Sequence, residues 1–317
     1  MIFLVPILLP VLTQYLNVFN IISFPMNTEF NKGLYLAGLG SFWWGFFGVI
    51  YFKYIAFIGH IELVIHRCLW TTFTLIITTL LFSKWSIFFK IIKNKNNLFY
   101  LFISGILIFI NWGVWIYAIA TNRIIDASFG YFIMPILSVM LGYIFFKEEL
   151  NKKRIFSIIL VLLSILFLIF VSVKSLPWVG IIVAFSWSFY NLVRKKINVD
   201  TDVGLLIESL FILPIALLVF YLIVNNGYND FKLSDPPMML FIFLAGPMTV
   251  IPLFLYVRGV ELCGLGPAGM IFYITPTFQF LLGYFYYNEP FSISKLVSFI
   301  FIWIAVIIYL KDLHETN

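Results

Sequence analysis

One stretch of this chain occurs twice, and this duplication limits the folds that the chain can adopt. Residues 126–149, DASFGYFIMPILSVMLGYIFFKEE, align without a gap with residues 267–290, PAGMIFYITPTFQFLLGYFYYNEP, at a constant offset of 141 positions. The aligned pairs include seven identities, which are Ala127/Ala268, Ile133/Ile274, Pro135/Pro276, Leu141/Leu282, Gly142/Gly283, Tyr143/Tyr284 and Glu148/Glu289. Chance would give about two or three identities in so apolar a composition. The duplication predicts a fold built from two similar helical bundles.

The composition is that of a protein in a lipid bilayer. Charged residues make up only 11% of the chain and hydrophobic residues 62%. A soluble domain has about 25% charged residues, so this chain cannot cover itself with a water-compatible surface. The net charge of +6 could suggest an anionic partner such as nucleic acid. The positions of the Lys and Arg residues along the chain explain this charge better, as shown below. Cys68 and Cys263 both lie in apolar stretches and indicate no disulfide framework.

The apolar residues fall into ten continuous runs, each close to the length of about 20 residues that a helix needs to cross a bilayer. A β-barrel would instead need segments of about 10 residues that alternate in polarity. We therefore predict an all-α integral membrane protein with about ten transmembrane helices, at residues 33–53, 61–83, 98–120, 126–146, 154–173, 177–193, 203–224, 238–258, 266–287 and 294–311.

Lys and Arg residues set the expected orientation of these helices, because they are enriched in cytoplasmic loops. With the N-terminus inside, thirteen of them lie on the cytoplasmic side and five lie outside, at Lys53, Arg123, Lys174, Lys232 and Lys295. Both termini are therefore predicted to be cytoplasmic. Since each half then contains five helices, the two copies have opposite orientations, as in many secondary transporters. The expected units are an N-terminal segment 1–32, a first repeat 33–173, a second repeat 174–312 and a short cytoplasmic tail 313–317.

Residues 1–25 have no evident targeting role. They are apolar, but the first positive charge is Lys32, so the basic region of a signal peptide is missing. The segment is either an extra or interfacial helix or a stretch upstream of a working start at Met26, and we favour the second interpretation.

A series of short motifs is distinctive: HRCLW at 66–70, NWGVWIYA at 111–118, DASFGYFIMP at 126–135, SLPW at 175–178, LVRKK at 192–196, IES at 207–209 and YITPTFQFLLG at 273–283. These motifs closely resemble those of the RarD subfamily, in the EamA branch of the drug/metabolite transporter superfamily. The resemblance covers about residues 30–312. It implies a ten-helix, two-repeat carrier of small metabolites in the bacterial inner membrane, with no settled substrate or set of functional residues. Asp126 departs from the subfamily, which usually has Glu there, so the charge is kept while its reach is shorter.

Ionisable residues inside a bilayer cost about 2.5–3.5 kcal/mol each on insertion scales, which makes them candidates for function. We expect two polar clusters that contact the substrate or act as gates. The outer cluster contains His66, Arg67, Tyr117 and Asp126, and the inner cluster contains Glu208, Arg258 and Glu261. Within the inner cluster, Glu208 and Arg258 are expected to form an ion pair that closes the cytoplasmic side. Structural ion pairing near the headgroups is the alternative for both clusters.

The second expected helix carries a polar stripe. Glu62, His66, Trp70 and Thr74 recur every four residues, so they share one helix face. Glu62 and His66 either share a proton or pair with one another, or Glu62 simply lies at the level of the outer headgroups. Arg67 either faces a substrate cavity or extends to the headgroups.

Two residues near the middle of the third expected helix, Asn111 and Trp112, are candidates for substrate contact. Asn111 either binds the substrate or bonds to a neighbouring helix, as polar residues in membrane bundles often do. The run Arg194–Lys196 at the end of the sixth helix is most simply a topology signal that contacts headgroups.

The repeated stretch also contains residues expected to shape the helices. Ser138 and Gly142 form a pair of small residues that favours close helix packing, and Gly283 is its counterpart in the second copy. Pro135 and Pro276 either free backbone carbonyls toward a cavity or simply kink their helices.

Three classes of function compete. A secondary transporter fits the inverted repeat, the sparse charges inside the spans and the short loops. A membrane enzyme is disfavoured, because His60, Glu62 and His66 lack the spacing of a zinc-protease motif and neither G-x-S-x-G nor a Walker A motif occurs. No catalytic residue, metal site or cofactor is therefore predicted. A pore would need a filter or a charged ring, and neither is visible, while a lipid flippase stays open.

The expected partner is a small-molecule solute, and the presence of groups of both charges favours a zwitterionic one. Proton coupling through Glu62 and His66, or through Glu208, is a hypothesis that rests on their being titratable groups at membrane depth. The sequence is compatible with a homodimer as well as with a monomer.

Overall fold

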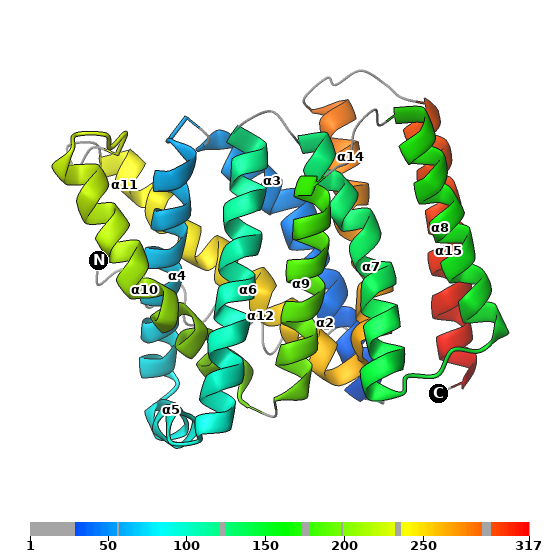
Figure 1. The fold of residues 1–317 in the computed structure, drawn as a ribbon, viewed down its shortest axis with the longest axis horizontal. Helices are drawn as coiled ribbons and strands as arrows, with labels where there is room; N and C mark the ends of the chain where they lie inside the picture. The colour runs from blue at the N-terminus through cyan, green and yellow to red at the C-terminus, as the bar shows by residue number, and fades with distance from the viewer. Residues whose placement is uncertain are drawn as a thin grey trace.

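The structure, a computed structural model, describes residues 29–55, 57–120, 124–172, 178–197, 199–231, 236–286 and 293–316. Every regular element in these ranges is a helix (Figure 1). The elements are α2 (Glu29–Trp43), the π-helix η1 (Trp44–Gly48), α3 (Val49–Tyr54), α4 (His60–Leu81), α5 (Trp85–Ile92), α6 (Lys95–Ala120), α7 (Ile124–Phe146), α8 (Lys152–Ser172), α9 (Trp178–Lys196), α10 (Thr201–Asn225), α11 (Pro236–Phe243), α12 (Ala245–Cys263), α13 (Leu265–Ile271), α14 (Ile274–Phe285) and α15 (Ile293–Thr316).

Each of the ten apolar runs contains helix, so the predicted all-α class is confirmed for the described part of the chain. Seven helical stretches there are long and apolar enough to cross a membrane: Glu29–Tyr54, His60–Leu81, Lys95–Ala118, Thr201–Asn225, Pro237–Cys263, Leu265–Leu282 and Leu296–Leu313. Gly130–Phe146 is a shorter apolar helix. The total of ten spans stays a prediction.

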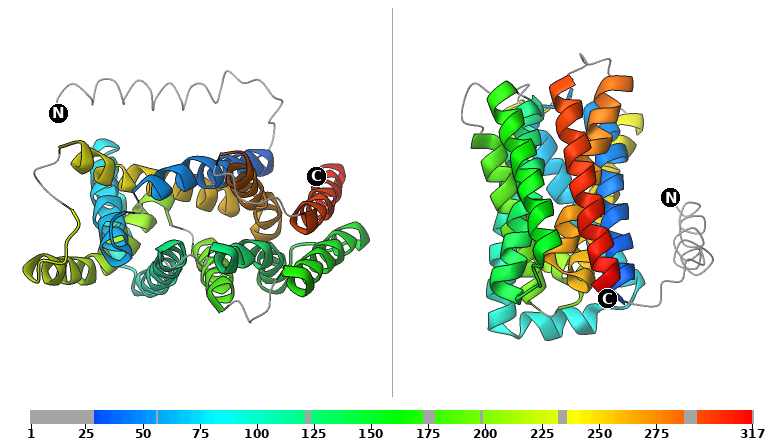
Figure 2. Two further views of the ribbon diagram at one scale, coloured as in Figure 1. Left: turned by 90° about the horizontal axis from the view of Figure 1, so that it is seen from above. Right: turned by 90° about the vertical axis from the view of Figure 1, so that its right-hand side faces the viewer.

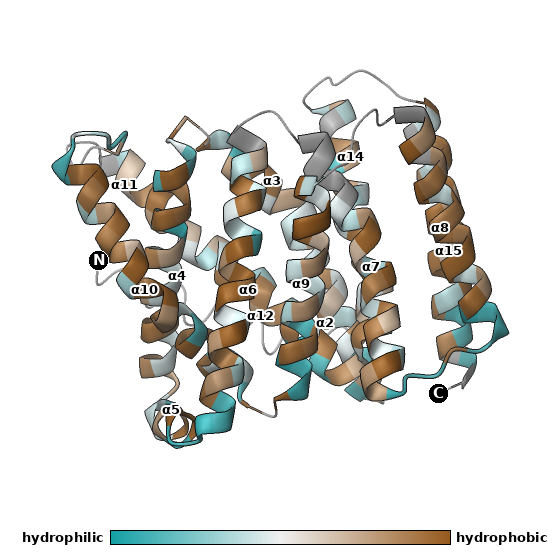
Figure 3. Ribbon diagram, in the orientation of Figure 1, coloured by the Kyte–Doolittle hydropathy of each residue, from teal (hydrophilic) through white to brown (hydrophobic). Residues whose placement is uncertain are grey.

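The helices stand side by side in two layers (Figure 2). One layer contains α10, α6, α9, α7 and α8, and the other contains α4, α12, α2, α14 and α15. The short helix α5 lies across one end of the bundle, at the bottom of Figure 1. We call this the α5 end. Hydrophilic residues gather there, whereas the middle of the bundle is mostly hydrophobic (Figure 3).

Helices at matching positions of the two halves pack against each other. The pairs α4/α10, α7/α13 and α8/α15 are each in contact, and the contact between α2 and α12 has a counterpart between α9 and α6. The members of the α8/α15 pair run in opposite directions, because α8 leaves the α5 end and α15 returns to it (Figure 1). The two halves are therefore joined along matching surfaces through the middle of the bundle.

The repeated proline has different effects in the two copies. Pro135 lies inside a continuous helix, α7. The second copy is interrupted between α13 and α14, and Pro276 falls in the first turn of α14. A proline lacks the N–H of a helical hydrogen bond, which the first turn does not need. Pro135 is thus accommodated within a helix, whereas Pro276 follows a break.

The small residues of the repeat make two kinds of close approach. A Cβ atom on Gly269 would lie 2.7 Å from Ser138 Cβ, so Ser138 lies where α7 and α13 pack most tightly. Gly142 differs from the expectation, because a Cβ there would meet the carboxylate of Glu148 rather than a neighbouring helix. Gly283 lies in α14, and its surroundings lie outside the described part of the structure.

Candidate functional site

Arg67, on α4, is a predicted site residue that the structure encloses almost completely, with 1% of its surface exposed. Its guanidinium carbon lies 4.5 Å from the ring centroid of Trp112 and 4.9 Å from that of Phe52. The rings of Trp44 and Trp115 lie at 5.8 and 5.9 Å. These distances are in the range of cation–π contacts. We call the four aromatic residues the arginine cage, and their burial of Arg67 excludes the alternative in which it extends to the headgroups.

The cage leaves the hydrogen-bonding capacity of Arg67 largely unused. Nε donates to Thr249 Oγ1 on α12 at 3.0 Å, whereas the buried Nη2 has no hydrogen-bond partner. No carboxylate of the described residues lies within ion-pairing distance of this guanidinium. Since a guanidinium has five N–H donors and accepts nothing, Arg67 is a buried cation whose Nη2 lacks an acceptor, enclosed by residues of η1, α3, α6 and α12.

Asn111 joins α6 to α9, and tryptophans lie near it on both helices. Asn111 Nδ2 donates to Val183 O at 3.0 Å and to Ser186 Oγ at 3.1 Å, so it bonds to a neighbouring helix, one of its two expected roles. Trp112 Nε1 is buried without a hydrogen-bond partner. Trp187 packs edge-on against Trp44 of the cage, with 5.2 Å between ring centroids.

Glu62 and His66 lie near the end of the bundle opposite the α5 end. Glu62 is buried and accepts hydrogen bonds from the backbone N–H groups of Asp230 at 2.6 Å and Phe231 at 3.1 Å. His66 Nε2 lies 3.4 Å from Glu62 Oε1, and its ring contacts those of Phe220 and Phe231. Glu62 therefore ties the segment after α10 to α4 rather than facing the headgroups.

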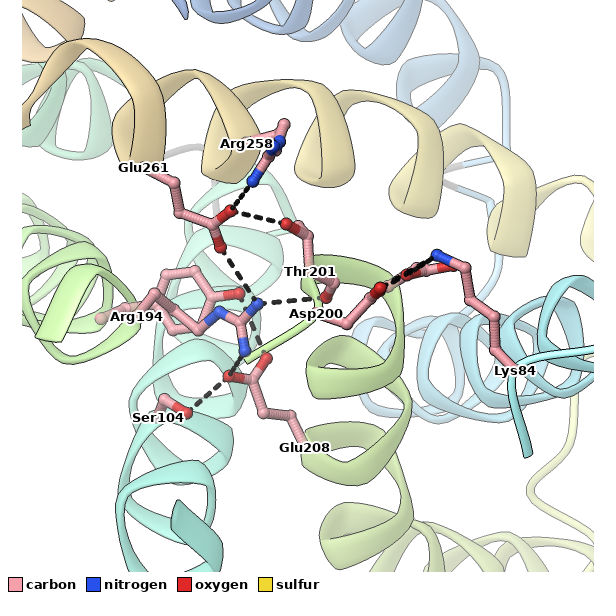
Figure 4. Close-up of polar contacts among 10 residues, drawn as sticks. Lys84, Ser104, Arg194, Asp200, Thr201, Glu208, Arg258 and Glu261 are labelled. Carbon is pink, nitrogen blue, oxygen red and sulfur yellow. Dashed lines mark hydrogen bonds and ion pairs between the residues drawn. The ribbon is translucent and has the colours of Figure 1, made fainter. Parts of the chain in front are cut away.

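A second buried cation, Arg194, lies at the α5 end (Figure 4). It comes from the last turn of α9 and its side chain is 0% exposed. Nη1 lies 3.4 Å from Glu208 Oε1 on α10. Ser104 Oγ of α6 donates to the same oxygen at 2.5 Å, and Tyr190 OH donates to Glu208 Oε2 at 3.2 Å. Glu208 is thus a buried carboxylate that a cation and two hydroxyls hold in place.

The network continues to α12 through the start of α10. Arg194 Nη2 donates to Thr201 O at 3.1 Å and lies 3.7 Å from Glu261 Oε1. Glu261 Oε2 accepts from Thr201 Oγ1 at 2.7 Å and from Arg258 Nη1 at 3.0 Å (Figure 4). The expected Glu208–Arg258 ion pair is therefore wrong. The side chain of Arg258 is 43% exposed and pairs three residues along its own helix, while Arg194 takes the place beside Glu208.

Lys84, in the turn before α5, joins the two halves at the same end. Its ammonium lies 2.7 Å from Asp202 Oδ1 and 3.1 Å from Asp200 Oδ1. Burial alone would lower the pKa of Lys84, but the hydrogen bonds that its ammonium donates to Asp202 and Asp200 outweigh burial and raise that pKa above its usual value. Burial would likewise raise the pKa of Asp200, but the hydrogen bonds with Asp202 and Lys84 hold it below its usual value.

Glu148, the carboxylate of the repeat, forms another connection between the halves. It accepts from the backbone N–H groups of Leu265 and Gly266, both at 2.8 Å, and pairs with Lys195 at 3.0 Å. A carboxylate is favourable there because the first N–H groups of a helix have no partner within it. The repeated carboxylate therefore caps α13.

Of the other members of the expected outer cluster, the structure describes the side chain of Tyr117 but not that of Asp126. The ring of Tyr117 lies beside those of His60 and Trp178, at 6.1 and 6.0 Å between centroids. The backbone of Asp126 belongs to α7, and its side chain lies outside the described part of the structure. Sequence reasoning did not select several polar residues of these contacts, among them Arg194, Ser104, Tyr190, Thr249, Lys84, Asp200 and Asp202.

Known proteins resemble this chain over most of its length. The model of the EamA-like transporter family matches it twice, over residues 31–170 and 175–311. Protein RarD of Escherichia coli (strain K12) is 32% identical over 281 residues, which cover 89% of this chain and 94% of that protein. The uncharacterized transporter YojE of Bacillus subtilis (strain 168) is 32% identical over 286 residues, covering 89% and 95%. A solved crystal structure shares the fold, with a TM-score of 0.66 at 12% identity, over 88% of this chain and 97% of its own.

Proposed function

Because this chain belongs to the EamA-like transporter family, we propose that it is a secondary carrier that moves a small metabolite or drug-like solute by alternating access. It is a membrane transporter of the drug/metabolite type, and its bacterial relatives favour a multi-pass location in the inner membrane. Beyond family membership, the proposal specifies the transport mechanism and the class of transported solute. Neither the family name nor the relatives' names specifies a substrate for this chain.

Alternating access requires two units that move relative to each other around one site. The two separate matches of the family model, over residues 31–170 and 175–311, support two such units. The packing of matching helices, with α8 and α15 running in opposite directions, supports an inverted arrangement of the two repeats. Inverted repeats place the substrate site near the midplane, at their interface.

The observation that carries the proposal is the polar closure of the α5 end between the two halves. Lys84 binds Asp200 and Asp202, Ser104 donates to Glu208, and Glu148 holds the start of α13. Each contact pairs a residue of the first half with one of the second, and each is a hydrogen bond or an ion pair that separates without breaking a covalent bond. We infer that these contacts close the cytoplasmic side in the present state and open in the other.

Counterflow in proteoliposomes tests the carrier mechanism. Vesicles that contain the purified protein would be preloaded with an unlabelled mixture of amino acids, nucleosides and chloramphenicol, and the uptake of each labelled compound would be measured. A carrier gives a transient accumulation of its labelled substrate that depends on the internal solute. Uptake that does not saturate and ignores the internal solute would indicate a pore, and movement of labelled lipid would indicate a flippase.

A further inference from the structure

The arginine cage has the features of a site for an anionic group. We propose that Arg67 and the cage bind a single carboxylate, and that the transported solutes are small organic monoanions with an apolar or aromatic body. This proposal rests on the proposed function, since it takes the bound solute to be the one that is transported.

The first argument is the state of the guanidinium. Arg67 is 1% exposed and Nη2 has no partner, while Nε is bound only to the neutral hydroxyl of Thr249. The rings of Trp112 and Phe52 stabilise the positive charge through cation–π contacts, but they are not strong hydrogen-bond acceptors for its N–H groups. A buried charged donor without an acceptor is unfavourable. A bound carboxylate would supply the missing acceptors in the planar geometry that a guanidinium prefers.

The second argument is the character of another unpartnered group of the cage. Trp112 Nε1 is buried and unpartnered, and Trp187 packs on Trp44 of the cage. An indole N–H is a donor only. The cage thus presents an excess of donors, and a ligand that complements them must be rich in acceptors.

The third argument concerns the size of the charge. Among the described residues, Arg67 is the single cation at the cage. The other buried arginine of the two sites, Arg194, pairs with Glu208 and Glu261 at the α5 end. One guanidinium balances one negative charge, so a monocarboxylate fits better than a phosphate dianion. The four rings of the cage favour an apolar or aromatic remainder, which loses little on leaving water.

The test measures binding to the full-length protein in detergent by isothermal titration calorimetry. The probes are acetate, hexanoate, benzoate and phenylacetate, each compared with its neutral amide, together with phenyl phosphate. We expect at least one carboxylate to bind about tenfold more tightly than its amide, and hexanoate, benzoate or phenylacetate to bind more tightly than acetate. Equal binding of acid and amide, or no binding of any acid, would overturn the proposal. A preference for phenyl phosphate would overturn the assignment of the charge.

Variants locate the binding in the cage. Arg67→Gln should weaken carboxylate binding at least tenfold, and Arg67→Lys should recover only part of it because the planar fork is lost. If these variants fail to fold, Trp112→Phe keeps a ring in the cage while removing one N–H, and we expect it to weaken binding several-fold. Lys90→Gln is the matched control, since Lys90 is an exposed cation on α5, and it should bind like the wild type. Unchanged binding in the folded cage variants contradicts the proposal.

Two further measurements distinguish this proposal from a resident counter-ion at Arg67 and from the proposed carrier mechanism. An Asp126→Asn variant that binds the acids far more tightly than the wild type would identify a resident counter-ion for Arg67 and would overturn the proposal. Unchanged binding in that variant supports it. Carboxylate binding at Arg67 without counterflow would support the carboxylate site and contradict the proposed carrier function. Counterflow of a neutral solute that Arg67→Gln leaves intact would keep the carrier and reject the site.

Discussion

Arg194 and Glu208 form a fully enclosed ion pair at the α5 end, with 3.4 Å between Nη1 and Oε1. Both belong to the second half of the chain, and Ser104 of the first half donates to the same carboxylate oxygen. The pair therefore links the internal structure of one half to its contact with the other.

Removing one partner of this pair should be far more damaging than removing both. Arg194→Gln or Glu208→Gln leaves one buried charge without its partner, which costs about 3–5 kcal/mol. We expect each single variant to lower the unfolding temperature in detergent and to impair accumulation. The double variant should recover part of the loss, and Arg258→Gln should cost little because its partner Glu261 keeps Thr201. A double-mutant cycle without coupling energy between Arg194 and Glu208 would contradict this account.

Gly204 allows the same pair to be disturbed without changing any charge. A Cβ on Gly204 would collide with the guanidinium of Arg194. We therefore expect Gly204→Ala to lower the unfolding temperature and to reduce transport, although Ala is the better helix former by about 1 kcal/mol. Gly113→Ala is the matched control, because a Cβ there meets nothing within 4 Å. Equal unfolding temperatures for the two variants would show that Arg194 moves aside freely.

Lys84 and Asp200 should give the α5 end a defined dependence on pH. The pKa of Asp200 is lowered on folding, so its contribution is present above its unfolded pKa of about 3.9 and is lost as the pH falls through the folded value. The pKa of Lys84 is raised, so its contribution is present below about 10.4 and is lost as the pH rises through the folded value.

Lys84→Met should accordingly lower stability by on the order of 1 kcal/mol between these limits, since the ammonium is partly exposed to solvent. The unfolding temperatures of wild type and Lys84→Met, measured from pH 3 to pH 11, should differ most at neutral pH and converge at both extremes. Lys90→Met, on the same turn–helix segment, is a control for the loss of a cytoplasmic charge. A constant difference across the whole range would show that the ion pairs contribute nothing.

The predicted orientation has a direct test in reporter fusions. The start of α6 and the start of α8 lie at the α5 end, and residues 226–231 lie at the opposite end (Figure 1). Fusions after Lys95 and after Arg154 should report a cytoplasmic location, and a fusion within residues 226–231 should report an outside location. The reverse pattern would place the closed α5 end outside and would invert the proposed state of the transporter.

Proton coupling is expected to act through His66. This imidazole lies 3.4 Å from Glu62, and its Nδ1 is buried without a partner, so a proton gained there changes the charge of an enclosed pair. Uptake into proteoliposomes should change several-fold with an imposed pH gradient. His66→Gln should abolish that response, and His60→Gln should keep it. Uptake that ignores the gradient in the wild type would favour facilitated exchange.

The role of Arg67, which was selected as an intramembrane charge, stays a prediction. The sequence predicted the helical class of the described residues correctly, because apolar length is a local signal. It failed for Arg194, whose position beside two lysines resembles a headgroup anchor. The signal that was missed is a face of Trp187, Tyr190, Asn191 and Arg194, spaced by three or four residues and buried in the structure. A cationic residue that lies on such a buried helix face is directed into the protein like the other residues of that face.

The Glu208–Arg258 pair failed for a different reason. Equal depth in the membrane does not fix the direction in which a side chain leaves its helix, and Arg258 pairs with Glu261 of its own helix instead. The partners of Glu62 were equally hidden, because backbone N–H groups 168 and 169 residues further along the chain carry no sequence signature. Contacts between distant segments depend on the assembled packing.

The unequal behaviour of Pro135 and Pro276 bears on the resting direction of the transporter. Two halves of identical construction would give facing-in and facing-out states of nearly equal energy, and the empty protein would populate both. Here one half carries an unbroken α7 and the other a break between α13 and α14. In the proposed alternating-access carrier, the energies of these two states would then differ even without a bound solute. A difference of about 1.4 kcal/mol is enough for a ten-to-one preference, so a single interrupted helix can decide which side of the membrane the empty site faces.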